Sequence, residues 1–167
     1  GRPFAAVNFS RQFSPKHPTA YLQDFWHRQL GAEGKKEDVS EAVQLFRHWS
    51  NHVNITVVDL DACLNTVVDG EGRRTDVSEE DLLWLLTQVQ QKLKEASQFE
   101  DLGRQLTSLL WALSRIAQRP GITEKVRDNA KALLMASEKQ VQEAAKADDL
   151  EPRYIGLAAW SFAKVNL

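Results

Sequence analysis

Basic and tryptophan side chains recur at matching positions in the C-terminal half of this 167-residue chain. Two sets of three residues lie 49 positions apart, and they are Arg104, Trp111, Arg115 and Arg153, Trp160, Lys164. Guanidinium groups contact phosphates, and an aromatic plane stacks on an unpaired base for about 1–3 kcal/mol. If the segments that carry these sets stack in parallel, the side chains line up as a nucleic-acid-binding surface. In the alternative interpretation the tryptophans pack between helices and the basic groups only solvate the surface.

Two histidines and two aspartates are the remaining candidates for metal binding or acid–base chemistry. His48 and His52 lie one helical turn apart, as zinc-binding histidine pairs do. Asp59 or Cys63 could supply a third ligand, but His48 has no neighbouring glutamate of the kind found in metalloproteases. Nothing positions Asp59 and Asp61 for proton transfer. We therefore expect two ordinary histidines in a helix and no metal site.

The glycine-containing loop and the single cysteine add no catalytic site. Gly70 and Gly72 lie in an acidic loop that lacks the Lys-Ser/Thr pair of a phosphate-binding loop. Cys63 lies in an apolar segment and is typical of a small core residue. No nucleophile is paired with a base. The sequence therefore predicts a protein that is not an enzyme, with no catalytic residue and no cofactor.

The length and composition of the chain exclude several classes of protein. Hydrophobic residues make up 43% of the chain and charged residues 26%, with a formal net charge of -2. This length and composition favour one globular domain. The lone cysteine excludes an intramolecular disulfide, and no apolar run approaches the roughly 18 residues of a membrane span. The near-neutral charge supplies no bulk attraction for nucleic acid.

The chain divides by composition into three regions. The first 23 residues carry Arg2, Arg11 and Lys16 but no acidic residue, and prolines interrupt any helix there. This pattern is typical of an extended arm or of the remnant of an organellar targeting segment. We expect an extended basic N-terminal arm over 1–18, a divergent helical region over 19–75 and helical-hairpin repeats over 76–167.

Every element with a clear pattern is a helix, so the predicted fold class is all-α. Ser78 and Thr123 are expected N-caps, Asp38 with Glu41 resembles a capping box, and Pro152 suits a first helical turn. The segment 57–68 contains β-branched residues, but its apolar positions follow helical spacing. The expected helices are 19–30, 38–52, 57–68, 78–97, 99–118, 123–147 and 152–167.

Three of these helices share a pattern centred on Trp84, Trp111 and Trp160. Each has a main apolar stripe on the side opposite its indole, and polar or basic residues beside the indole. One complete helix lies between the last two copies, so the 49-residue offset is the period of a two-helix repeat. A helix with apolar features on two sides lies between layers. The pattern therefore predicts stacked helical hairpins, an α-solenoid-like repeat.

The motifs LTSLLWALSRIA (106–117) and IGLAAWSFAKV (155–165) resemble the signature helix of octatricopeptide-type repeats. Related repeats occur in the FAST-kinase-like and RAP-domain proteins of organelles. The resemblance covers about residues 80–167. It implies a helical-repeat protein that binds organellar RNA and acts in its stability, processing or translation, in some members as part of an organellar ribosome. It also implies an organellar location, a mitochondrion in preference to a plastid.

The last helix bears on possible partners because no helix follows it to cover its apolar stripe, which comprises Ile155, Ala158, Phe162 and Val165. An uncovered stripe indicates either a longer native chain or a docked partner. Two functions stay open. One is binding of single-stranded or ribosomal RNA. The other is a non-catalytic scaffold or accessory subunit of an organellar complex, with protein subunits covering the helix 152–167.

Overall fold

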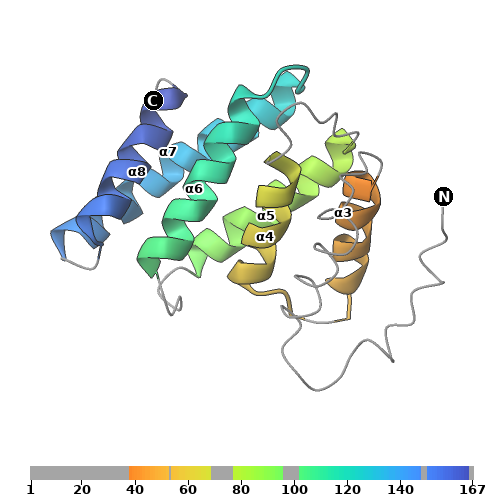
Figure 1. The fold of residues 1–167 in the computed structure, drawn as a ribbon, viewed down its shortest axis with the longest axis horizontal. Helices are drawn as coiled ribbons and strands as arrows, with labels where there is room; N and C mark the ends of the chain where they lie inside the picture. Colours follow the sequence, from red (N-terminus) through yellow and green to blue (C-terminus); the bar gives the residue numbers. More distant parts are fainter. Residues whose placement is uncertain (1–37, 53, 69–76, 96–101, 148–149, 166–167) are drawn as a thin grey trace. The chain divides into compact units, whose positions relative to one another are not determined.

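The computed structural model describes residues 38–52, 54–68, 77–95, 102–147 and 150–165. Within these ranges the regular structure is entirely helical (Figure 1), which confirms the all-α fold class. The helices are α3 (Asp38–Trp49), α4 (Val57–Val68), α5 (Glu79–Lys94), α6 (Leu102–Gln118), α7 (Glu124–Lys146) and α8 (Pro152–Lys164). The predicted N-terminal arm (1–18), the helix 19–30 and the loop with Gly70 and Gly72 lie outside the described residues.

Side-chain caps begin α5 and α7 where the sequence places them. Ser78 Oγ accepts a hydrogen bond from the Asp81 backbone N–H at 3.1 Å, and Thr123 Oγ1 accepts one from the Val126 N–H at 3.4 Å. Each satisfies an N–H group that has no partner within its helix. Pro152 occupies the start of α8, where its missing N–H costs nothing.

A reciprocal cap that the sequence reading missed begins α4. Thr56 Oγ1 accepts a hydrogen bond from the Asp59 N–H at 3.2 Å, while Asp59 Oδ2 accepts from the Thr56 N–H and Oγ1, each at 2.9 Å. This is a capping box with aspartate in the third position. It supplies partners to one oxygen of the fully buried Asp59 carboxylate, and it begins α4 as a helix despite the β-branched residues of that segment.

The chain forms two compact units, residues 1–77 and 78–167. In the first unit α3 packs against α4. Both helices contribute fully or nearly fully buried side chains, which are Val43, Leu45, Phe46, Trp49, Leu60, Cys63, Leu64 and Val67. Cys63 is thus the small core residue that the sequence predicts.

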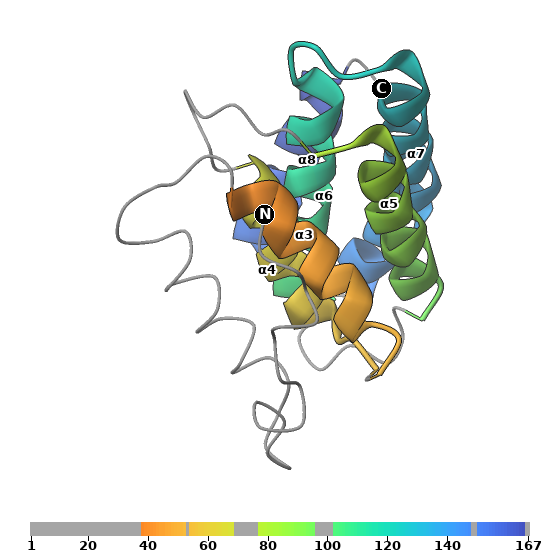
Figure 2. The same cartoon turned by 90° about the vertical axis from the view of Figure 1, so that its right-hand side faces the viewer.

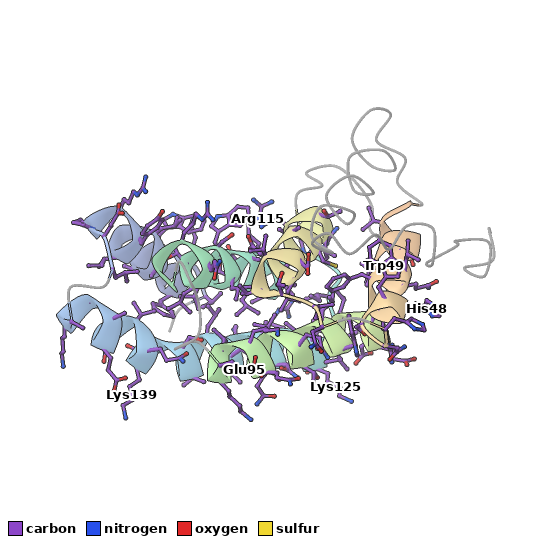
Figure 3. The ribbon with its side chains drawn as sticks, turned by 90° about the horizontal axis from the view of Figure 1, so that it is seen from below. His48, Trp49, Glu95, Arg115, Lys125 and Lys139 are labelled. Atoms are coloured by element: carbon purple, nitrogen blue, oxygen red, sulfur yellow. The ribbon has the colours of Figure 1, made fainter. Side chains whose placement is uncertain are left out.

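The second unit has two layers, with α5 beside α7 in one and α6 beside α8 in the other (Figures 2 and 3). Helix α6 packs on both α7 and α8, and α7 also contacts α5 and α8. The side of α6 that the helical spacing predicts as apolar is buried, with Leu106, Leu109, Leu113 and Ile116 at most 1% exposed. Burial of that stripe is the main source of the stability of α6.

Helices α6 and α8 run in the same direction, with α7 antiparallel to both (Figure 1). Gly103 marks how closely they approach, because a Cβ atom there would lie 3.1 Å from Leu150 Cδ1 and 3.2 Å from Tyr154 Cδ2. The first turn of α6 therefore lies against the first turn of α8. Residues that correspond across the repeat are consequently close to level in the two helices.

Within the described ranges, no helix has both the length and the hydrophobicity needed to cross a bilayer.

Candidate nucleic-acid interface

One stripe of α6 keeps solvent exposure while the rest of the helix is buried. Between Gly103 and Gln118 the exposed or half-buried side chains are Arg104, Gln105, Ser108, Trp111, Arg115 and Gln118. Residues spaced by three and four positions share one side of a helix, so these form a single stripe. Figure 3 shows Arg115 turned away from the layer of α5 and α7, whereas Lys125 and Lys139 lie on the opposite side of the unit.

A cation lies over the indole in both copies of the motif. Arg115 Cζ is 4.9 Å from the centroid of the Trp111 ring, and Lys164 Nζ is 5.2 Å from that of Trp160. Each pair joins residues one helical turn apart, and at exposed sites such a contact is worth about 0.5–1 kcal/mol. Trp160 is 41% exposed and Trp111 is half-buried. Both helices therefore present an indole with a positive charge held beside it.

Arg153 makes its contacts at the start of its own helix. Its Nε lies 3.0 Å from the Glu151 carboxylate, and its Nη2 donates to Tyr154 Oη at 3.0 Å. The guanidinium also stacks over the Tyr154 ring at 4.7 Å. Arg104 is exposed at the corresponding place in α6. Glu151 thus balances part of the basic charge near the start of α8.

Neither α6 nor α8 contains an acidic residue, whereas α5 and α7 contain several. Because α6 and α8 lie side by side and in parallel, their equivalent stripes point out of the same layer. We call this surface the outer face, and its residues are Arg104, Trp111, Arg115, Arg153, Trp160 and Lys164. The formal net charge of -2 therefore conceals an uneven distribution of charge between the two layers.

Arg119, just beyond α6, extends the basic series that the sequence reading ends at Arg115. Burial, and secondly the charge of Arg115, lower the pKa of Arg119 from its ordinary value. An arginine stays protonated at neutral pH despite such a shift. The four-residue spacing from Arg115 is the sequence signal for this position, although the following Pro120-Gly121 indicates a turn.

The histidines and aspartates considered as candidates make local contacts. The rings of His48 and His52 lie 5.0 Å apart with their planes tilted by 57°. No three His, Cys, Asp or Glu side chains in the described part of the chain cluster as a metal site would need. Asp59 is held in its capping box, and Asp61 Oδ1 accepts a hydrogen bond from Asn65 Nδ2 at 3.0 Å.

The expectation that the apolar stripe of α8 is uncovered is wrong for most of its residues. Ala158 is fully buried, Val165 is 5% exposed and Phe162 is half-buried, so only Ile155, at 38%, is exposed. The reason is that α8 packs on α6 as well as α7, and a helix-by-helix reading cannot anticipate the second contact. Exposed apolar surface on α8 lies instead at other positions, including Leu157 and Trp160.

Comparisons with protein-family models, with curated proteins and with solved structures find no match to this chain.

Proposed function

We propose that the outer face of α6 and α8 binds single-stranded RNA, in a helical-repeat protein of an organelle. The observation that carries this proposal is the repeated pairing of a cation with an exposed or half-buried indole on two neighbouring helices that lack acidic residues. Basic grooves with aromatic platforms are the usual means of binding unpaired nucleic acid. The resemblance to octatricopeptide-type repeats supports the same class of ligand.

The geometry suggests how each group acts. Trp160, with two fifths of its surface exposed, offers the larger stacking surface for an unpaired base. Lys164 beside it supplies a charge for the adjoining phosphate, and Arg115 does the same beside Trp111. Packed helices lie about 8–10 Å apart, so each repeat could serve its own short stretch of one strand. The stacked-hairpin array is the architecture that this arrangement implies, and it belongs to the proposal.

The direct test measures binding of a fluorescein-labelled single-stranded RNA of mixed sequence by anisotropy at several salt concentrations. One variant replaces four outer-face residues with alanine, at Arg104, Arg115, Arg153 and Lys164. The control variant also removes four positive charges, from exposed lysines of α5 and α7, at Lys94, Lys125, Lys139 and Lys146. Both variants have the same net charge, so bulk electrostatics cannot distinguish them.

We expect the outer-face variant to bind at least tenfold more weakly, with a shallower dependence of affinity on salt, because fewer phosphates release counterions. The control should stay within about threefold of the parent protein. Trp160→Ala should weaken binding by roughly 5- to 150-fold, which corresponds to the loss of one stacked base. No binding at low salt, or equal losses in the two quadruple variants, would refute the proposal.

A second candidate function, a scaffold within an organellar complex, is favoured by the exposed apolar residues of α8. Ile155, Leu157 and Trp160 are each about two fifths exposed on this one short helix. Leu157 and Trp160 lie three positions apart on one side of α8, and exposed apolar residues that share a side are typical of surfaces that bind other proteins. Co-purification of the native protein with a stoichiometric assembly that survives nuclease treatment would support this function over RNA binding.

A further inference from the structure

One side of α8 is open to solvent although the equivalent side of α6 is buried. The exposed residues on this side of α8 are Pro152, Ile155, Gly156, Ala159 and Ala163, which we call the lateral face. Their counterparts 49 residues earlier are Gly103, Leu106, Thr107, Leu110 and Ser114, and all of these are buried. The two helices share a motif, so the difference in burial shows what a neighbour covers.

In α6 the neighbour on this side is α8. A Cβ atom on Gly103 would crowd Leu150 and Tyr154, which places the first turns of the two helices in direct contact. The residues that follow on this side of α6 are Thr107, Leu110 and Ser114, and most of them are small. Small residues at a helix–helix contact allow the two backbones to approach closely.

The lateral face of α8 has the same character, but its residues are exposed. Glycine and two alanines occupy the places of Thr107, Leu110 and Ser114. A Cβ atom on Gly156 would meet nothing within 4 Å, in contrast with the crowded Gly103. The lateral face is therefore a surface of the same kind as the one on which α8 itself sits.

We propose that the lateral face binds one helix of a protein partner, parallel to α8, as α8 binds to α6. The α6–α8 contact defines the chemistry of that helix. It should present a large aromatic residue in its first turn, small residues four and seven positions later, and an aliphatic residue at eleven. The residues of α8 that show this pattern are Tyr154, Ala158, Ser161 and Val165, and they are half-buried to fully buried. No charged residue belongs on that side of the partner helix.

A second copy of this chain does not supply such a helix from α8, because that side of its own α8 is already packed against α6. The proposed surface also differs from the outer face. It consists of small and aliphatic side chains, and it contains none of the basic residues or tryptophans assigned to RNA. The proposal therefore stands or falls independently of RNA binding.

The probe is a synthetic peptide with the sequence of residues 150–165, labelled with fluorescein and held helical by a staple on the side away from Tyr154. Circular dichroism verifies that the peptide is helical before use. Anisotropy then measures its binding to the full chain. We expect saturable binding that Ala159→Glu weakens at least tenfold. Ala132→Glu, an identical substitution at an exposed position of α7, should leave it unchanged.

A cross-linking experiment tests the direction and register of the bound helix. One turn beyond the contact of Gly103 with Tyr154, Thr107 comes level with Ala158. Gly156 is the counterpart of Thr107, so Gly156→Cys in the protein should form a disulfide with a peptide carrying Ala158→Cys. A peptide carrying Val165→Cys should react much more slowly. Cys63 is fully buried and does not compete.

Three results would overturn the proposal. The first is the absence of saturable binding by the helical peptide. The second is equal binding to the parent protein and to Ala159→Glu, which would mean that the peptide displaces α8 from α6. The third is sedimentation of the free protein as a dimer that Ala159→Glu dissociates, which would show that a second copy covers the lateral face.

Discussion

Replacing Gly103 with leucine should destabilise the second unit, whereas the same substitution at Gly156 should not. Gly103 is the second residue of α6 and Gly156 is the fifth residue of α8. A side chain at Gly103 must enter space that Leu150 and Tyr154 already fill, with the first added carbon only 3.1 Å and 3.2 Å from their atoms. At Gly156 the added side chain meets open solvent.

The comparison of the two variants isolates the effect of crowding. Leucine is a better helix former than glycine by up to about 1 kcal/mol, and crowding opposes this gain only at Gly103. Inserting extra carbon atoms into a packed contact costs about 1–3 kcal/mol. We therefore expect the free energy of unfolding of Gly103→Leu to be lower than that of Gly156→Leu by about 1–3 kcal/mol. Gly103→Ala should fall between them, because Leu150 and Tyr154 can shift by a few tenths of an ångström.

Thermal unfolding followed by far-ultraviolet circular dichroism measures this difference. At about 2–4 °C per kcal/mol for a protein of this size, the melting temperatures should differ by roughly 2–12 °C. The parent protein should lie between the two leucine variants. A melting temperature of Gly103→Leu equal to or above that of Gly156→Leu would refute the close contact between α6 and α8. It would also remove the template for the proposed binding at the lateral face.

Two further substitutions test the caps. Thr56→Ala removes the capping box of α4 and one donor from the buried Asp59 carboxylate, so it should lower the free energy of unfolding by about 0.5–2 kcal/mol, whereas Thr56→Ser should retain most of it. Gln140 Nε2 donates at 2.7 Å to the Leu93 carbonyl in the last turn of α5. Gln140→Ala should therefore lower the free energy of unfolding, measured in urea, by about 1 kcal/mol. A decrease no larger than that caused by Gln142→Ala, at an exposed position, would contradict this.

Local signals in the sequence were sufficient to locate the described helices to within a few residues. Ser78 and Thr123 are the N-caps of α5 and α7. Each precedes a segment of helical apolar spacing, and its side-chain oxygen accepts a hydrogen bond from a free N–H group in the first turn of that helix. The reading of 57–68 as helical is confirmed, although the reciprocal bonds of Thr56 and Asp59 went unrecognised. Capping boxes more often carry glutamate or glutamine, which is why this one was missed.

Part of the candidate site was predictable for the same reason. Residues four apart share one side of a helix, so the pairing of Arg115 with Trp111 and of Lys164 with Trp160 follows from spacing once the helices are assigned. The commitment of Arg153 to Glu151 and Tyr154 did not follow, because neighbouring groups at a helix start compete through geometry that spacing does not describe.

The sequence alone determined the helical class, the apolar stripe of each helix and the repetition of the tryptophan motif, since each depends on residues within a few turns of one another. Only the tertiary structure decided which sides of those helices are covered. The packing of α8 against α6 buries Ala158 and Val165, which the sequence predicted to be open, and leaves Gly156 and its neighbours exposed. Burial depends on residues distant in the chain, and the 49-residue period fixes which positions correspond but not which of them acquire a neighbour.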